Sequence, residues 1–223
     1  MTQPHYLTIY LSIYLSRSKL KKISCSLGFS TITKYKIQIV NWRKIPIMRI
    51  LLTGYPGVGK TTICRKVSEE LRGEVTGFYT EEVRVNGTRI GFDIVTLGDN
   101  EQRGILARTV SQINGPKVGQ YTVHVTDFET IAIPCLKAVG RQYLVVDEIG
   151  KMESFSQKFK QEIRKLFTEF DGDIIAIIPH SRGSPLPLVQ EISELSNTEI
   201  IMVTKENRDS IPTQIINRIK NYS

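Results

Sequence analysis

The chain has 223 residues, 40% of them hydrophobic, which suffices for one sizeable domain or one domain with an appendage. Its net charge of +8 is unevenly distributed: of its 30 Lys and Arg side chains, eight lie in residues 1–47, which contain no Asp or Glu. Residues 48–223 therefore hold 22 basic and 22 acidic side chains. This balance gives no reason to expect nucleic-acid binding by the larger part.

Residues 1–47 also differ in pattern. Residues 6–16 read Tyr-Leu-Thr-Ile, Tyr-Leu-Ser-Ile, Tyr-Leu-Ser, a repeat that repeated TATC tetranucleotides would encode. We expect residues 1–47 to be an extension, disordered or translated from repetitive DNA, and residues 48–223 to form the domain. Organellar targeting by this basic segment is the alternative. Its apolar stretch is shorter than the ~20 residues of a membrane span, so no membrane partner is expected.

The three cysteines, Cys25, Cys64 and Cys135, lack the spacing of a disulfide framework or a zinc site. Cys64 falls on the apolar side of a predicted helix, where it serves as a small buried hydrophobe. This cysteine usage fits a reducing compartment, so we expect a cytoplasmic protein.

The most informative stretch is Gly54–Thr61, which matches the phosphate-loop pattern G-x-x-x-x-G-K-[ST] at every fixed position. The apolar run Ile50–Leu52 predicts a buried strand before it, and apolar residues at helical spacing predict a helix after it that ends near Gly73. In that context backbone N–H groups and the helix N-terminus bind phosphates. The predicted triphosphate-binding residues are Gly54, Tyr55, Pro56, Gly57, Val58, Gly59, Lys60, Thr61 and Thr62.

The chain then predicts an antiparallel excursion and a series of alternating elements. Asn86-Gly87 is a strong hairpin signal between two strand-like stretches, and residues 98–119 are punctuated by glycine and predicted mostly as loop. Further strands are predicted over 120–125, 143–146, 174–178 and 200–203, and helices over 128–139, from a cap at Ser154, over 185–195 and from near Ser210.

Because the later strands lack polar alternation, they predict a mostly parallel sheet covered by helices on both faces. The last two of these strands, over 174–178 and 200–203, are predicted to be central. Ligands bind at the carboxyl ends of such strands. The loops that follow Thr53, Val146, Ile178 and Val203 should therefore converge on the nucleotide.

Asp147 and Glu148 end one of the buried strands and form the second nucleotide signature. We predict that Asp147 binds Mg²⁺ together with the Thr61 hydroxyl, and that Lys60 contacts the β- and γ-phosphates as a catalytic residue. Glu148 is predicted to orient or deprotonate the attacking water. An acid directly after the metal-binding Asp favours hydrolysis over simple nucleotide switching.

The third candidate site is the loop Thr204–Asp209. It parallels the guanine-reading pattern [NT]-K-x-D, with Asn207 in place of the Asp, and a side-chain amide should relax base choice because it donates as well as accepts. The alternative is a polar loop in which Asn207, Asp209 or Ser210 caps the last helix. Candidates for a transition-state arginine are Arg103, Arg108 and Arg182.

With these residues assembled, the chain resembles the small P-loop nucleoside-triphosphatases. The resembling segments, in order, are GYPGVGKTT, GFYTEEVR, RIGFDIVTL, VGQYTVHVTDFETIAIP, VVDEIGKMESFS and MVTKENRD. The resemblance implies a RecA-like α/β domain that slowly hydrolyses ATP, GTP and other triphosphates to diphosphate and phosphate with Mg²⁺. It assigns family roles to Lys60, Thr61, Asp147 and Glu148. Glu191–Glu194 stand where relatives tend to have arginines, so no catalytic arginine is expected there.

Two other functions compete with hydrolysis. A nucleotide or nucleoside kinase would share the phosphate loop, and Glu81, Glu82 and Arg84 could hold an acceptor, but an arginine-rich lid that excludes water is not evident. A GTP-binding switch is disfavoured by Glu148 and Asn207. The sequence leaves the physiological substrate and the oligomeric state open.

Overall fold

The computed structural model describes residues 47–98, 101–137, 142–180 and 183–221, and every structural statement concerns these ranges. The predicted extension lies outside them except for Ile47, as does the candidate arginine Arg182. The prediction for the extension therefore stays a prediction.

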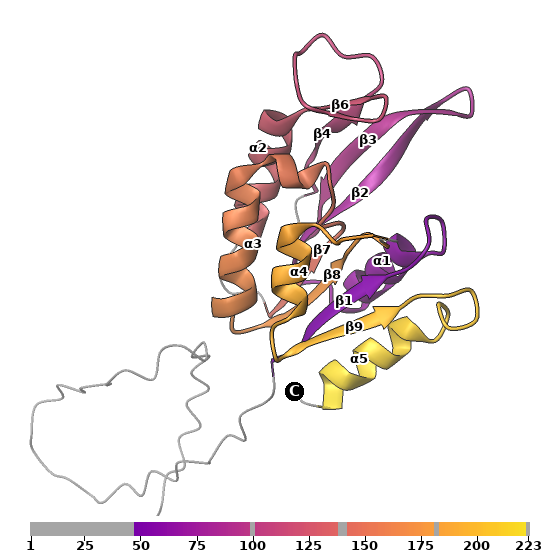
Figure 1. Ribbon diagram of the computed structural model, residues 1–223. Helices are drawn as coiled ribbons and strands as arrows, with labels where there is room; N and C mark the ends of the chain where they lie inside the picture. Colours follow the sequence, from indigo (N-terminus) through magenta and orange to yellow (C-terminus); the bar gives the residue numbers. More distant parts are fainter. Residues whose placement is uncertain (1–46, 99–100, 138–141, 181–182, 222–223) are drawn as a thin grey trace, which may run out of the picture. The chain divides into compact units, whose positions relative to one another are not determined.

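The described residues form one mixed sheet (Figure 1). Its order is β5-β6-β4-β3-β2-β7-β8-β1-β9. The pairs β2–β7, β7–β8, β8–β1 and β1–β9 are parallel, and the remaining four pairs are antiparallel. The strands are β1 (Arg49–Thr53), β2 (Val75–Val85), β3 (Thr88–Thr96), β4 (Arg103–Arg108), β5 (Lys117–Val118), β6 (Tyr121–Val123), β7 (Tyr143–Val146), β8 (Asp173–Ile177) and β9 (Thr198–Met202).

Helices cover both faces of this sheet, as predicted (Figure 1). One core lies under α1 and α5 and includes Ile50, Val67 and Ile215; the other lies under α2, α3 and α4 and includes Phe78 and Phe159. The helices are α1 (Lys60–Glu70), α2 (Val125–Leu136), α3 (Gln157–Glu169), α4 (Pro187–Ser193) and α5 (Ile211–Asn221), with a 3₁₀ turn, η1 (Glu153–Phe155). No helix within the described ranges is long and apolar enough to cross a membrane.

The prediction that residues 98–119 are mostly loop missed two strands. This stretch contains β4 and β5, and β4 pairs with both β3 and β6. Arg103, Gly104 and Ala107 of β4 give a weak local strand signal. The strand is instead stabilised by its two neighbours and by ion pairs from Arg103 to Asp93 (3.2 Å) and to Glu81 (2.6 Å), which are non-local contacts.

The start of α3 was also predicted wrongly. Ser156, not Ser154, is its N-cap, because the Ser156 hydroxyl accepts a hydrogen bond from the backbone N–H of Phe159 at 3.0 Å. Ser154 lies in η1, where its hydroxyl donates to the Gly150 carbonyl at 2.6 Å. Two serines two residues apart offer the same capping chemistry, and the chain between them forms a 3₁₀ turn.

The strand predicted over 200–203 was expected in the centre of the sheet, but β9 is an edge strand that pairs with β1 alone. Its Ile200 and Met202 side chains are 50% and 45% exposed. An apolar run does not distinguish a central strand from an edge strand, because both can read as uninterrupted hydrophobic residues.

Gly77 allows β2 to pair with β7. Its φ is +114°, and a methyl group on its Cα would overlap the carbonyl oxygen of Val145 in β7. We expect Gly77→Ala to lower the free energy of unfolding by more than ~3 kcal/mol, measured by urea denaturation. Gly87→Ala is the control, because Gly87 has φ +77° but open space around it and should cost only about 1–2 kcal/mol. Equal losses in the two variants would contradict this expectation.

Candidate active site

The loops predicted to converge do meet at one edge of the sheet. The backbone N–H of Val203 donates to the Thr53 carbonyl at 2.7 Å, and the Thr53 hydroxyl donates to the Pro179 carbonyl at 3.3 Å. The rings of Tyr55 and His180 lie 4.5 Å apart, centroid to centroid. The loop after β1 therefore contacts those after β8 and β9, and the loop after β7 reaches it through Thr61 and Asp147, as described below.

The phosphate loop has a backbone that only glycine adopts readily. Gly54, Gly57 and Gly59 have φ values of +149°, +74° and +109°. A methyl group on Gly54 would lie 2.5 Å from the Val203 carbonyl oxygen. Gly59 is the N-cap of α1 and supplies no side-chain hydrogen bond to it. The first N–H groups of α1 are thus left for another acceptor, as an anion site requires.

Lys60 is the first residue of α1, and its side chain folds back over the loop. The ammonium group donates to the carbonyls of Gly54 at 2.7 Å and Tyr55 at 3.2 Å. These two acceptors belong to the first turn of the phosphate loop. The positive charge is therefore held at the loop that the sequence assigns to phosphate.

Asp147 follows β7 and is only 2% exposed. The Thr61 hydroxyl donates to its carboxyl group, yet its Oδ2 has no hydrogen-bond partner, the one such buried side-chain atom in the described ranges. Burial raises the pKa of Asp147 to about 7; the Thr61 hydrogen bond and the Lys60 charge oppose this shift, and the Glu148 charge adds to it. An unpartnered buried carboxylate oxygen beside a threonine hydroxyl offers the oxygen donors that suit a hard cation.

Glu148 is half-buried and is joined to Asp147 by a cis peptide bond. Burial raises the pKa of the Glu148 carboxyl, and the nearby Lys60 ammonium lowers it. Its Oε1 lies close to Gly150, at 2.5 Å from where a methyl group on that residue would be. The structure therefore brings Lys60, Thr61, Asp147 and Glu148 into one charged cluster.

A third acid beside this cluster, Glu153, was not predicted from the sequence. It is 4% exposed, and its Oε2 accepts a hydrogen bond from the Gly150 N–H at 3.1 Å. Burial raises its pKa to about 8, with a further contribution from the Glu148 charge. The sequence offered no signal, because Lys151-Met152-Glu153 reads as an exposed turn before a helix.

Asn207 uses both polar atoms of its side chain within its own loop. Its Oδ1 accepts from the Thr204 N–H at 2.8 Å, and its Nδ2 donates to the Met202 carbonyl at 2.8 Å. The side chain thus closes the loop after β9 and does not cap α5. Its predicted role at the nucleotide base stays a prediction.

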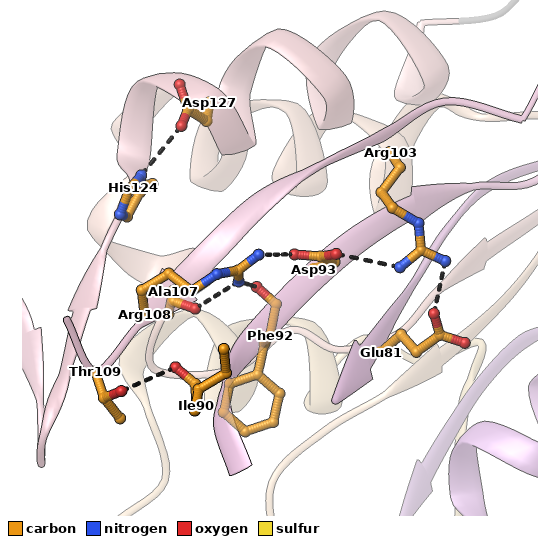
Figure 2. Close-up of polar contacts among 10 residues, drawn as sticks. All are labelled: Glu81, Ile90, Phe92, Asp93, Arg103, Ala107, Arg108, Thr109, His124 and Asp127. Carbon is orange, nitrogen blue, oxygen red and sulfur yellow. Dashed lines mark hydrogen bonds and ion pairs between the residues drawn. The ribbon is translucent and has the colours of Figure 1, made fainter. Parts of the chain in front are cut away.

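The next residue, Arg208, was not predicted to lie at the site. Its Nη1 donates to the Val58 carbonyl at 3.4 Å, and its Cδ lies against Gly59. Two of the predicted arginines instead lie on β4, which four strands separate from β1, and they pair with acids of the neighbouring strands β2 and β3 (Figure 2). Arg103 contacts Asp93 and Glu81, and Arg108 contacts Asp93. Arg208 could have been noted from its position directly after the predicted Asn207.

Comparison with known proteins agrees with this geometry. The family model described as NTPase matches residues 49–216. The chain belongs to the NTPase family. Human cancer-related nucleoside-triphosphatase is 44% identical over 180 residues, covering 75% of this chain and 94% of that protein. Nucleoside-triphosphatase THEP1 of Thermotoga maritima is 41% identical over 176 residues, covering 78% and 96%.

Two solved NTPase structures resemble the fold. The crystal structure of THEP1 from Aquifex aeolicus has a TM-score of 0.65 at 38% identity and covers 75% of this chain and 96% of that one. The solution structure of a human cancer-related nucleoside triphosphatase has a TM-score of 0.67 at 43% identity, covering 78% and 98%. The predicted RecA-like P-loop fold is thereby confirmed.

The raised pKa values of Asp147 and Glu153 give a pH dependence of stability. Both acids ordinarily titrate near pH 4, so between about pH 4 and pH 8 the folded protein binds more protons than the unfolded chain. The free energy of unfolding of metal-free protein should therefore fall as pH rises through this window, by at most ~1.4 kcal/mol per pH unit for each group. Urea denaturation at several pH values measures it.

Glu153→Gln should make this decline shallower above about pH 5, because it removes one of the two groups. Glu169→Gln, at an exposed position at the end of α3, is the control and should leave the slope unchanged. An identical slope in wild type and Glu153→Gln would contradict the assignment.

Proposed function

We propose that this NTPase hydrolyses nucleoside 5′-triphosphates to diphosphate and phosphate in a Mg²⁺-dependent reaction, with broad base specificity, including ATP and GTP, and slow turnover. The names of its relatives support the hydrolase class. The observation that carries the proposal is the acid pair of buried Asp147 and half-buried Glu148 beside Lys60 and Thr61.

Phosphate binding would use the loop Gly54–Thr62. The three glycines with positive φ allow backbone N–H groups to turn toward an anion, and the N-terminus of α1 adds its positive dipole end. The Lys60 ammonium now bonds two loop carbonyls, and it can exchange these for the β- and γ-phosphate oxygens without moving its backbone.

Thr61 and Asp147 would hold the Mg²⁺ ion, and the unpartnered Oδ2 of Asp147 supports this assignment. When bound, Mg²⁺ neutralises charge that develops on the β- and γ-phosphates. Two protein ligands are typical, since Mg²⁺ takes most of its coordination from phosphates and water. The nearby Lys60 ammonium lowers the pKa of Asp147 and of Glu148, which favours their ionised forms.

Glu148 would accept a proton from the attacking water. Burial raises the pKa of its carboxyl group, which suits a general base, and the nearby Lys60 ammonium opposes that rise. The water oxygen forms a bond to the γ-phosphorus while the bond from the γ-phosphorus to the β,γ-bridging oxygen breaks, so the products are inorganic phosphate, the nucleoside diphosphate and a protonated Glu148. Asn207 would contact the base; because its loop lacks the carboxylate that enforces guanine, base choice is broad.

The kinase alternative has less support in the contacts. Glu82 pairs with Arg84 and Arg89, and Glu81 pairs with Arg103 and, more distantly, with Arg65. The acids that could hold an acceptor are therefore already bound to arginines of the same surface.

Phosphate release measured without any acceptor separates hydrolysis from phosphoryl transfer. The purified full chain should release phosphate from ATP, GTP, CTP and UTP with kcat/KM values within about tenfold of each other, because no carboxylate selects the base. EDTA should abolish release, and added Mg²⁺ should restore it. Release that requires a nucleotide or nucleoside acceptor would identify a kinase instead.

Two substitutions should separate binding from chemistry. Lys60→Ala should weaken triphosphate binding at least tenfold, because the loop loses its charge-assisted contact to phosphate. Glu148→Gln should leave binding within about threefold and lower kcat by at least ~10²-fold, because the base is lost. Fluorescent-nucleotide titration and steady-state kinetics measure these effects.

Lys66→Ala is the matched control, since Lys66 is an exposed lysine on the same helix. Wild-type turnover in Glu148→Gln would assign the base elsewhere.

A further inference from the structure

Both backbone polar groups of Gly150 are hydrogen-bonded. Its N–H donates to Glu153 Oε2 at 3.1 Å, and its carbonyl accepts from the Ser154 backbone N–H at 3.1 Å and from the Ser154 hydroxyl at 2.6 Å. Gly150 and Glu153 are both buried. Without Glu153 the Gly150 N–H would be buried with no acceptor in the surrounding turn.

The same glycine touches the predicted base. A methyl group on Gly150 would lie 2.5 Å from Glu148 Oε1, 2.9 Å from Glu148 Cγ and 2.8 Å from Glu153 Oε2. The two carboxyl groups are therefore neighbours on one side of Gly150. The side chain of Glu148 lies along the turn that Glu153 holds.

We propose that Glu153 is a positioning residue, whose carboxyl group fixes the Gly150 turn and thereby orients the Glu148 carboxylate toward the attacking water. This inference rests on the proposed function, because it assigns Glu153 a role through Glu148. An unsatisfied buried N–H drives its peptide unit to seek another acceptor. A shift of about 1 Å in a catalytic group can cost ~10²-fold in rate.

The test compares Glu153→Gln with Glu153→Met in the full chain. Gln keeps a carbonyl acceptor for the Gly150 N–H, and its NH₂ group faces the Glu148 carboxylate, so kcat should stay within about threefold of wild type. Met has similar volume but no acceptor, and kcat should fall ~10–100-fold. The KM for ATP should change by less than about threefold in both, because the phosphate loop is untouched.

A double variant checks that the effect passes through Glu148. Glu148→Gln with Glu153→Met should be no slower than Glu148→Gln alone, since residues acting as one unit are non-additive. Gly150→Ala provides a second route if Glu153→Met fails to fold. Its methyl group would crowd both the Glu148 and the Glu153 carboxyl groups while leaving both side chains in place, and it should lower kcat selectively.

Three results would overturn the inference: equal kcat loss in Glu153→Gln and Glu153→Met, full kcat in Glu153→Met, or a further loss in the double variant. The proposed function is tested by a different result. Wild-type turnover in Glu148→Gln would show that Glu148 is not the base. An inactive Glu148→Gln together with a fully active Glu153→Met would contradict only the role of Glu153.

Discussion

The main constraint on this structure is that several carboxyl groups lie buried or half-buried near one lysine, at the edge where the parallel strands end. Asp147, Glu148 and Glu153 all have raised pKa values, mainly because burial penalises their charged forms. Lys60 is the basic group that lowers the pKa of both Asp147 and Glu148. Such a site lowers the stability of the protein in the absence of ligands, and buried charge with few compensating contacts is typical of functional sites.

The topology explains how this cluster forms. The strand that precedes the phosphate loop, β1, is not adjacent to β7, which precedes the acid pair; β8 lies between them. The carboxyl ends of all three strands reach the same edge, so α1 can present Lys60 and Thr61 to the acids across β8.

The antiparallel strands have a different role. They extend the sheet beyond β2 and carry an ion-pair chain in which Arg103 bridges Glu81 and Asp93, and Arg108 also contacts Asp93 (Figure 2). Arg65 of α1 lies over the Tyr79 ring at 5.0 Å, and its guanidinium is 3.7 Å from Glu81. These two contacts connect the antiparallel strands to α1, the helix that follows the phosphate loop. Most charged side chains of the antiparallel strands pair with one another.

The sequence alone determined the phosphate loop, the acid pair and the alternation of strands and helices, because each depends on residues within one short segment. The pattern at Gly54–Thr61 requires only its own glycines and its two flanks. Only the tertiary structure decided that β4 is a strand, that β9 lies at the edge, and that Glu153 and Arg208 contact the site. The positions of β4, β9 and Arg208 arise from contacts between segments far apart in the chain. The burial of Glu153 could not be read from its segment, because an exposed turn and a buried turn can contain the same residues.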